Sequence, residues 1–318
     1  MIPYCRLYEY FCQAPLGVDP VKPFVPPDAN ARARALGPTK DLSEELKKVL
    51  SPTEGFNPIP MPMPRDWLAH HAEQGQTYAE YVRARPHPPT TTRHTIYLLP
   101  LGEFPKEASP PQEQLKQYTK LFFGLETAAL KTLWLDGLAL TTRKNSSTGN
   151  RQILTWDVLA LLKHRLPEDA YVILAVTMED LYPENNWNFV FGQASLQDRV
   201  GVYSFARYDP AFYGKKHGED YPQILLRRSL KVLTHEVGHM FGLEHCVFYH
   251  CLMNGSNHLQ ESDAQPMSLC PVCLRKLHHL VQFDPVERYR KLQVFYRENQ
   301  LEAESQWVEA QLKRITGQ

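Results

Sequence analysis

The pattern of hydrophobic and polar positions changes at about residue 93. Before that point, prolines recur in three groups, within 20–27, 58–64 and 86–89. Proline cannot continue a helix, so this spacing favours extended segments that run over a surface. Short helices are predicted only at about 41–50 and 74–84. The first part of the chain is therefore predicted to be a proline-rich extension.

Beyond residue 93, apolar runs predict buried strands, and apolar residues at helical spacing predict helices between them. Strands are predicted at 95–100, near 133–142 and at 171–176. Helices are predicted at about 112–130 and 155–165. This alternation indicates an α+β protein with a mixed, twisted sheet covered by helices.

The second half of this region predicts two more strands and one long helix. The strands are expected at 189–191 and 200–206, joined through the residues between them. A polar loop at 209–222 leads to a helix at about 223–241. After Cys273, apolar residues recur at helical spacing among charged residues, which predicts a helical cap or a partner-binding helix.

The end of the long helix carries the residues of a metal-dependent hydrolase. His235 and His239 are four residues apart, so both imidazoles point to one side of a helix. Gly242 can take a left-handed conformation that turns the chain, and His245 can then supply a third ligand. Three ligands leave a fourth position for water, as a catalytic zinc requires. Glu236 stands beside the first histidine, placed to act on that water.

A cluster of cysteines begins at the next residue. Four of the six cysteines of the chain are packed together there: Cys246, Cys251, Cys270 and Cys273. Four thiolates make the closed tetrahedral set of a structural zinc site. Two disulfides, or a redox-active CxxC pair, are the alternatives. Residues 1–25 show no secretory signal, so a reducing compartment that favours thiolates on zinc is expected.

Taken together, these motifs resemble the signature of the archaemetzincins, a branch of the metzincin zinc proteases. The resemblance spans about residues 93–285. It implies a metzincin-like protease domain with an active-site helix and a C-terminal helical subdomain stapled by zinc. It also implies a Met-turn at Met253, which precedes the turn dipeptide formed by Asn254 and Gly255. In metzincins an edge strand binds the substrate, and 200–206 is the candidate for it.

The function implied is hydrolysis of peptide bonds by a zinc-activated water, with Glu236 as general acid and base. Two zinc ions per chain are expected, one catalytic and one structural. One alternative is a zinc-binding interaction protein that retains the site without hydrolysis. In another, Glu261 replaces His245 as the third ligand, as in gluzincins. In a third, Cys5 or Cys12 caps the zinc like the cysteine switch of matrixins, although neither has the sequence context of that switch.

Composition adds few constraints. Lys+Arg and Asp+Glu are both 35, so the chain has no net charge that would favour nucleic acid or an acidic membrane. No apolar stretch approaches the ~18 residues that span a bilayer. We therefore expect a cytoplasmic monomer with possible nuclear access that acts on peptides or proteins. The expected divisions are an extension at 1–92, a catalytic domain at 93–285 and a helical tail at 286–318.

Overall fold

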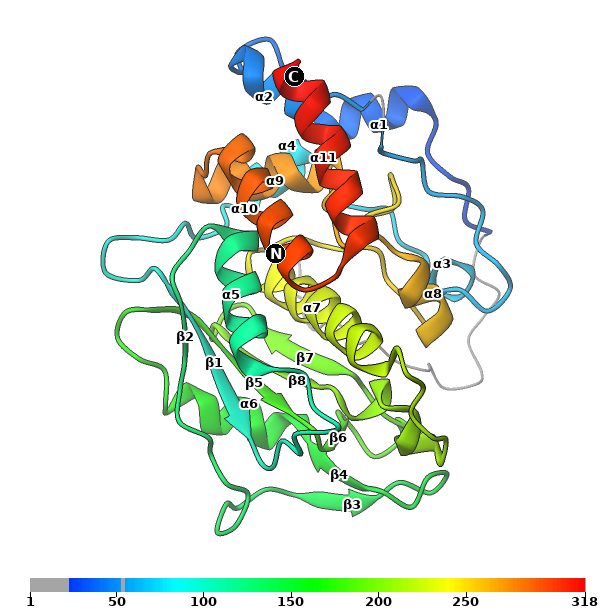
Figure 1. The fold of residues 1–318 in the computed structure, drawn as a ribbon, viewed down its shortest axis with the longest axis vertical. Coiled ribbons are helices and arrows are strands. Elements are labelled where there is room, and N and C mark those ends of the chain that lie inside the picture. The colour runs from blue at the N-terminus through cyan, green and yellow to red at the C-terminus, as the bar shows by residue number, and fades with distance from the viewer. Residues whose placement is uncertain (1–22, 53–54, 318) are drawn as a thin grey trace, which may run out of the picture. The chain divides into compact units, whose positions relative to one another are not determined.

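The computed structural model describes residues 23–52 and 55–317, which form two compact units (Figure 1). The first unit contains residues 90–116 and 126–240. The second contains the described residues up to Pro89, together with 117–125 and those from Phe241 onward. Cys5 and Cys12 lie outside the described residues, as does most of the segment examined for a secretory signal.

The core of the first unit is a mixed sheet of five strands, in the order β2-β1-β5-β8-β7. The bounds are β1 (Thr95–Leu101), β2 (Thr127–Ala129), β5 (Ala170–Thr177), β7 (Gly192–Ser195) and β8 (Val200–Ser204). Neighbouring strands run parallel except β7, which is antiparallel to β8. Every residue of β5 is buried, because helices cover both faces of this sheet. The predicted mixed sheet and its strands at 95–100 and 171–176 are confirmed.

Two helices of the first unit pack on opposite faces of this sheet. The helix α6 (Thr155–Lys163) shares a core with Ile173, Ala175 and Val202. The helix α7 (Tyr221–Met240) packs on the other face, where a Cβ placed on Gly201 would lie 3.4 Å from the Met240 sulfur. Both helices were predicted. The helix α7 is the predicted 223–241 helix, and its last turns carry the two histidines.

One predicted helix of this region is too long, and one predicted strand is wrong. The helix at 112–130 is shorter, because α5 (Gln112–Phe123) stops before Gly124, which has a φ of +69°, and the next residues form β2. The stretch 133–142 is mostly irregular, with one isolated bridge between Leu133 and Leu101. Its leucines pack against the core one at a time without a strand ladder, which explains the apolar pattern.

A smaller sheet of the first unit has the order β3-β4-β6. Its strands are β3 (Thr142–Lys144), β4 (Arg151–Leu154) and β6 (Asp180–Tyr182). Two short 3-10 helices follow β8. The first, η1 (Ala206–Tyr208), precedes the predicted polar loop, and the second, η2 (Pro210–Tyr213), lies within it.

The second unit is helical. Its N-terminal helices are α1 (Ala29–Leu36), α2 (Glu44–Val49), α3 (Trp67–His70) and α4 (Tyr78–Arg83). Its C-terminal helices are α8 (Leu259–Ala264), α9 (Pro271–Val281), α10 (Pro285–Glu298) and α11 (Glu302–Thr316). The predicted short helices are α2 and α4, and the predicted helical tail is α10 and α11. Since α2 contacts α10 and α11, and α4 contacts α9, the proline-rich region packs on the C-terminal helices. Within the described residues, none of the helices combines the length and the apolar character needed to cross a membrane.

A buried ion pair ties the smaller sheet of the first unit to η1, which follows β8. Arg207 donates from Nε and Nη2 to the two carboxylate oxygens of Asp180, both at 2.8 Å. The two side chains are only 5% and 1% exposed, and the guanidinium lies 3.5 Å from the ring centroid of Phe189. A buried pair of this kind requires both partners, because either charge alone would be desolvated without compensation.

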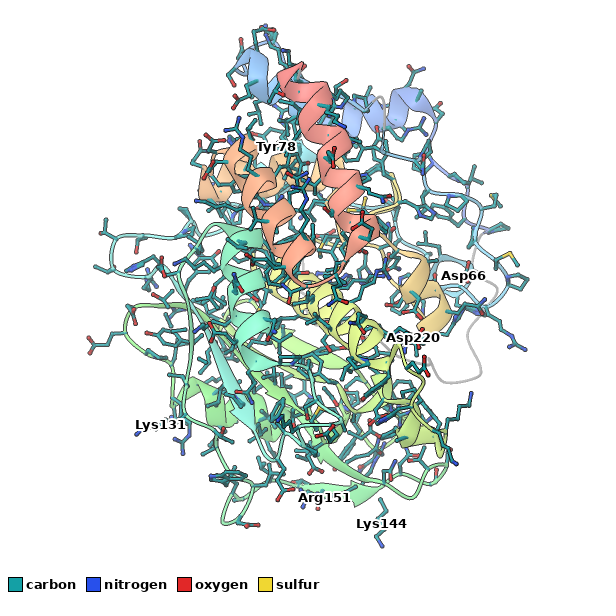
Figure 2. All side chains as sticks on the ribbon, viewed as in Figure 1. Asp66, Tyr78, Lys131, Lys144, Arg151 and Asp220 are labelled. Atoms are coloured by element: carbon teal, nitrogen blue, oxygen red, sulfur yellow. The ribbon has the colours of Figure 1, made fainter. Side chains whose placement is uncertain are left out.

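We therefore expect Asp180→Asn to lower the free energy of unfolding by about 3–5 kcal/mol, since it leaves Arg207 charged and buried. Glu179→Gln is the matched control, because Glu179 pairs with Arg151. Arg151 lies at the surface (Figure 2), where an ion pair contributes about 0–1 kcal/mol. Denaturant unfolding of the three proteins measures both effects. Equal losses in the two variants would contradict this account of the pair.

Candidate metal sites

The two histidines of α7 converge on one point. His235 and His239 lie one turn apart, and their Nε2 atoms are 2.8 Å from each other. Both side chains are buried, at 2% and 4% exposure. Because imidazole binds metals through one ring nitrogen, two converging Nε2 atoms are typical of a shared cation.

A turn after α7 brings in the third histidine. The helix ends at Met240, and Gly242 adopts the predicted left-handed conformation with a φ of +80°. One ring nitrogen from each of His235, His239 and His245 lies within 4.8 Å of the other two. In a tetrahedral zinc site with Zn–N of about 2.0–2.1 Å, ligand nitrogens are separated by about 3.4 Å. The three nitrogens are therefore close enough to share one zinc ion, and the 2.8 Å between those of His235 and His239 must widen by about 0.6 Å to reach this separation.

Glu236 lies against the edge of the main sheet. The side chain is 2% exposed, and a Cβ placed on Gly192 in β7 would lie 3.4 Å from its carboxyl carbon. The pKa of Tyr203 is raised well above its ordinary value, first by burial, then by Tyr208 and then by the charge of Glu236. The carboxylate is thus directed toward β7 and β8.

The predicted substrate strand at 200–206 is wrong in its position. It corresponds to β8, which is an interior strand between β5 and β7. The edge strands of the described sheet are β2 and β7, and β7 is the one beside β8. The strand predicted at 189–191 is β7, which lies three residues later than expected. Val190 makes only an isolated bridge, with Leu181. Order along the chain could not reveal this, because β7 folds back antiparallel on the strand that follows it.

The four cysteines form a compact, buried group of free thiols. The Sγ atoms of Cys246 and Cys270 are 3.6 Å apart, far longer than the ~2.05 Å of a disulfide. Four thiolates at ~2.3 Å from a zinc ion are separated by about 3.8 Å, which matches the observed distance. The backbone N–H of Cys270 also donates to the Cys251 sulfur at 3.2 Å.

Electrostatics supports a cation in this group. Burial raises the pKa of the Cys251 and Cys270 thiols well above their ordinary value, whereas the pKa of Cys246 is lowered, because burial is outweighed there by hydrogen bonds with the other three cysteines. Several thiolates held together in a buried site repel one another, and a divalent cation removes this penalty. The structure contains no disulfide among these four residues, so the arrangement favours zinc over that alternative.

Asn254 holds the loop that joins Cys246 to Cys251. Its amide nitrogen donates to the carbonyl oxygens of Cys246 at 2.6 Å and Tyr249 at 2.9 Å, and its carboxamide oxygen accepts from the Cys251 N–H at 2.8 Å. Met253, beside it, is fully buried, and its carbonyl accepts from the Cys246 N–H at 2.7 Å. The sequence indicated Asn254 only as a turn residue, whereas in the structure its side chain holds the loop together by three hydrogen bonds.

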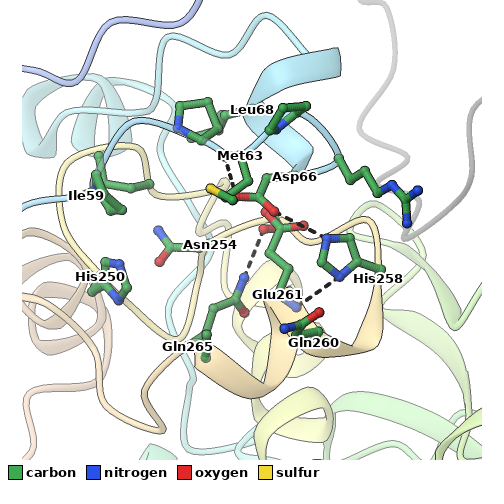
Figure 3. Close-up of a pocket in the computed structure, with 16 residues that line it drawn as sticks. Ile59, Met63, Asp66, Leu68, His250, Asn254, His258, Gln260, Glu261 and Gln265 are labelled. Atoms are coloured by element: carbon green, nitrogen blue, oxygen red, sulfur yellow. Dashed lines mark hydrogen bonds and ion pairs between the residues drawn. The ribbon is translucent and has the colours of Figure 1, made fainter.

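The structure also contains a cluster that the sequence did not indicate. Candidate ligand atoms of Asp66, His258 and Glu261 lie within 4.8 Å of one another, beside a cavity of about 520 Å³ (Figure 3). The carboxylate oxygens of this cluster already accept hydrogen bonds from other residues of the protein. Asp66 accepts from the Met63 N–H at 2.7 Å, and Glu261 accepts from the Trp67 N–H at 2.9 Å. The cluster therefore joins the segment around α3 to α8, and Glu261 is not among the ligand atoms of the three-histidine group.

A second carboxylate missed in the sequence contacts the third histidine. Glu73 accepts a hydrogen bond from Nδ1 of His245 at 2.8 Å, which leaves Nε2 as the metal-binding nitrogen. No local motif identifies Glu73, because it precedes His245 by 172 residues.

Comparison with known proteins connects this geometry to a family. Residues 154–279 match the family model described as Peptidase family M54. Archaemetzincin-2 of Homo sapiens is 40% identical over 265 residues, covering 74% of this chain and 73% of that protein. Archaemetzincin-1 of Homo sapiens is 32% identical over 257 residues, covering 71% and 51%. The crystal structure of archaemetzincin from Methanopyrus kandleri superposes with a TM-score of 0.47 at 28% identity, covering 61% of this chain and 99% of that one.

The clamp of Asn254 yields a testable expectation. Asn254→Ala removes three hydrogen bonds to buried backbone groups, so we expect the free energy of unfolding to fall by about 2–4 kcal/mol. The control is Asn299→Ala, which removes a single hydrogen bond to the Phe295 carbonyl at the end of α10. Denaturant unfolding and the metal content of the cysteine cluster are measured together. A loss no larger than that of the control would show that the loop is held by other contacts.

Proposed function

This chain belongs to the archaemetzincin family of zinc-dependent metallopeptidases, and on that premise we propose that it hydrolyses peptide bonds at the three-histidine site. The observation that carries the proposal is the convergence of ring nitrogens from His235, His239 and His245 within 4.8 Å. The substrates of a peptidase are peptides or proteins. The alternative of a zinc-binding protein without hydrolysis is not favoured by membership of a peptidase family.

The division of roles within the site follows from the residues present. When bound, zinc lowers the pKa of a coordinated water to about 7 and polarises the scissile carbonyl. Glu236 accepts a proton from the attacking water and later delivers it to the leaving amine. Its place next to His235 supports this role, because a carboxylate beside a ligand can reach the reacting water without occupying a ligand position.

We further propose that an extended substrate binds antiparallel along β7 (Gly192–Ser195). An edge strand offers backbone N–H and C=O groups to one added strand. These main-chain hydrogen bonds align a peptide whatever its side chains are. The nearness of Gly192 to the Glu236 carboxylate supports this strand as the one that places the scissile bond beside the general base.

A second, structural zinc is proposed on Cys246, Cys251, Cys270 and Cys273. Its proposed role includes support of the catalytic site, because His245 and Cys246 are neighbours in the sequence. Consecutive Cα atoms are ~3.8 Å apart, so fixing one residue restricts the position of the other. The cysteine cluster would thereby anchor the segment that delivers the third catalytic ligand.

Replacing Glu236 tests the proposed hydrolysis. We expect Glu236→Gln to lower peptide cleavage by ~10²–10⁴ while zinc content stays at two per chain, because only the proton transfer is lost. Glu219→Gln, at an exposed glutamate before α7, is the matched control. Mass spectrometry of a digested peptide library and elemental analysis supply the measurements. Unchanged cleavage would place the hydrolysis elsewhere, and a parallel loss of zinc would make Glu236 a ligand.

The coupling of the two sites has its own test. We expect Cys270→Ser to release the structural zinc and to weaken zinc binding at the histidines, with a loss of activity, although Cys270 is not among the histidine ligands. Ser146→Ala, at an exposed serine that belongs to neither candidate metal site, should leave the zinc content unchanged. Elemental analysis with chelator titration measures both. A single zinc in the native protein, or full activity of Cys270→Ser, would contradict the two-site proposal.

A further inference from the structure

Three residues of the proline-rich region hold the backbone that follows α7. Tyr81 donates its hydroxyl to the Phe241 carbonyl at 2.9 Å, and Gln76 donates from Nε2 to the Gly242 carbonyl at 3.3 Å. Glu73 contacts His245 itself. These contacts lie within the second unit and act on three residues of the turn, Phe241, Gly242 and His245. The segment 66–81, named here the brace, therefore fixes both the path of the turn and its last side chain.

We infer that Glu73 is a positioning residue for His245, holding the ring so that Nε2 is presented to the catalytic metal. The inference deepens the proposed function and rests on it. A carboxylate oxygen accepts hydrogen bonds, so the bond of 2.8 Å between Glu73 Oε1 and His245 Nδ1 places the ring proton on Nδ1. The Nε2 lone pair is then free to bind a cation, and the nearby negative charge makes the ring a stronger ligand.

Trp67 fixes Glu73 in turn. Its indole N–H donates to the same Glu73 oxygen at 2.8 Å, and its ring meets the His245 ring edge to face, with centroids 5.2 Å apart. The indole also lies against Gly255, where an added Cβ would come within 2.5 Å of it. Trp67 thus contacts His245, Glu73 and Gly255.

The brace is anchored at its beginning by the cluster described above. Glu261 accepts from the Trp67 N–H. Asp66 pairs with His258 at 3.2 Å (Figure 3). His71 stacks on the Trp67 ring with centroids 3.6 Å apart. Several independent contacts therefore hold Trp67, and a rigid support is what a residue that orients a metal ligand requires.

The brace lies outside the part of the chain that matches the peptidase family model, residues 154–279. The family match therefore does not supply this role, which comes from the contacts of Glu73. A carboxylate that orients a histidine ligand typically changes metal affinity by 10–100-fold when it is removed.

The test measures zinc affinity at the histidines in the full chain, with the zinc of the cysteine cluster as internal reference. We expect Glu73→Ala to weaken the histidine-site zinc ~10–100-fold in chelator competition. Glu73→Gln, which keeps an acceptor oxygen, should recover most of that loss. The control is Glu80→Ala, which removes only a local cap of α4 at Thr77 in the same segment. It should leave zinc affinity within about threefold of native, since a helix cap acts on stability.

A measurement on the native protein avoids dependence on the folding of variants. Long-range ¹H–¹⁵N spectra of the metal-free protein should show the neutral His245 ring with its proton on Nδ1. A proton on Nε2, or equal zinc affinity of Glu73→Ala and native protein, would overturn the inference while leaving the proposed function standing. If native protein and a His239→Ala variant hold the same amount of zinc, the three-histidine site and the proposed function fail together.

Discussion

The turn between Met240 and Cys246 is the constraint on which the candidate sites depend. Within seven residues the chain must end a helix and reverse direction. It must also supply His245 to one candidate zinc site and Cys246, the first ligand of the second candidate zinc site. A tetrahedral zinc accepts ligands only within a few tenths of an ångström of fixed distances, so the path of this turn leaves little freedom. The left-handed conformation of Gly242 makes the reversal possible.

The second unit supplies hydrogen bonds to this turn from several directions. Tyr81 and Gln76 bind its carbonyl groups, and Glu73 binds its histidine. At the end of the turn, the Asn254 side chain donates a hydrogen bond to the Cys246 carbonyl. The carbonyls at a helix end lack helical partners, and buried ones require donors from elsewhere. The same hydrogen bonds that satisfy this backbone therefore also set the position of the metal ligands.

The proline-rich region gains a physical explanation from these contacts. Extended chain has exposed backbone groups and little helical structure of its own, so it can follow the surface of another element and reach residues that a helix could not. In this protein it contacts the C-terminal helices through α2 and α4, and it brings Glu73 and Trp67 to His245. Its prolines are thus compatible with an ordered structural role over the described residues.

Local geometry explains what could be predicted from the sequence. The spacing of His235 and His239 places both on one side of any α-helix, and Gly242 favours a turn wherever it is placed, so the histidine group was predictable. The long apolar runs of β1 and β5 identify buried strands for the same reason. The cysteine spacing indicated a single cluster, whose sulfurs are close but unbonded.

Only the tertiary structure decided which strand lies at the edge of the sheet and which residues support the ligands. The edge position of β7 depends on pairing with β8 and on the absence of a further neighbour in the described sheet, and neither is visible in a run of apolar residues. The leucines after residue 130 bury their side chains without a strand, because burial depends on where the chain passes and not on its local conformation. Glu73 resembles any surface glutamate in the sequence. Folding gives it a role by bringing it to His245 across 172 residues, and contacts at such separation leave no local pattern to read.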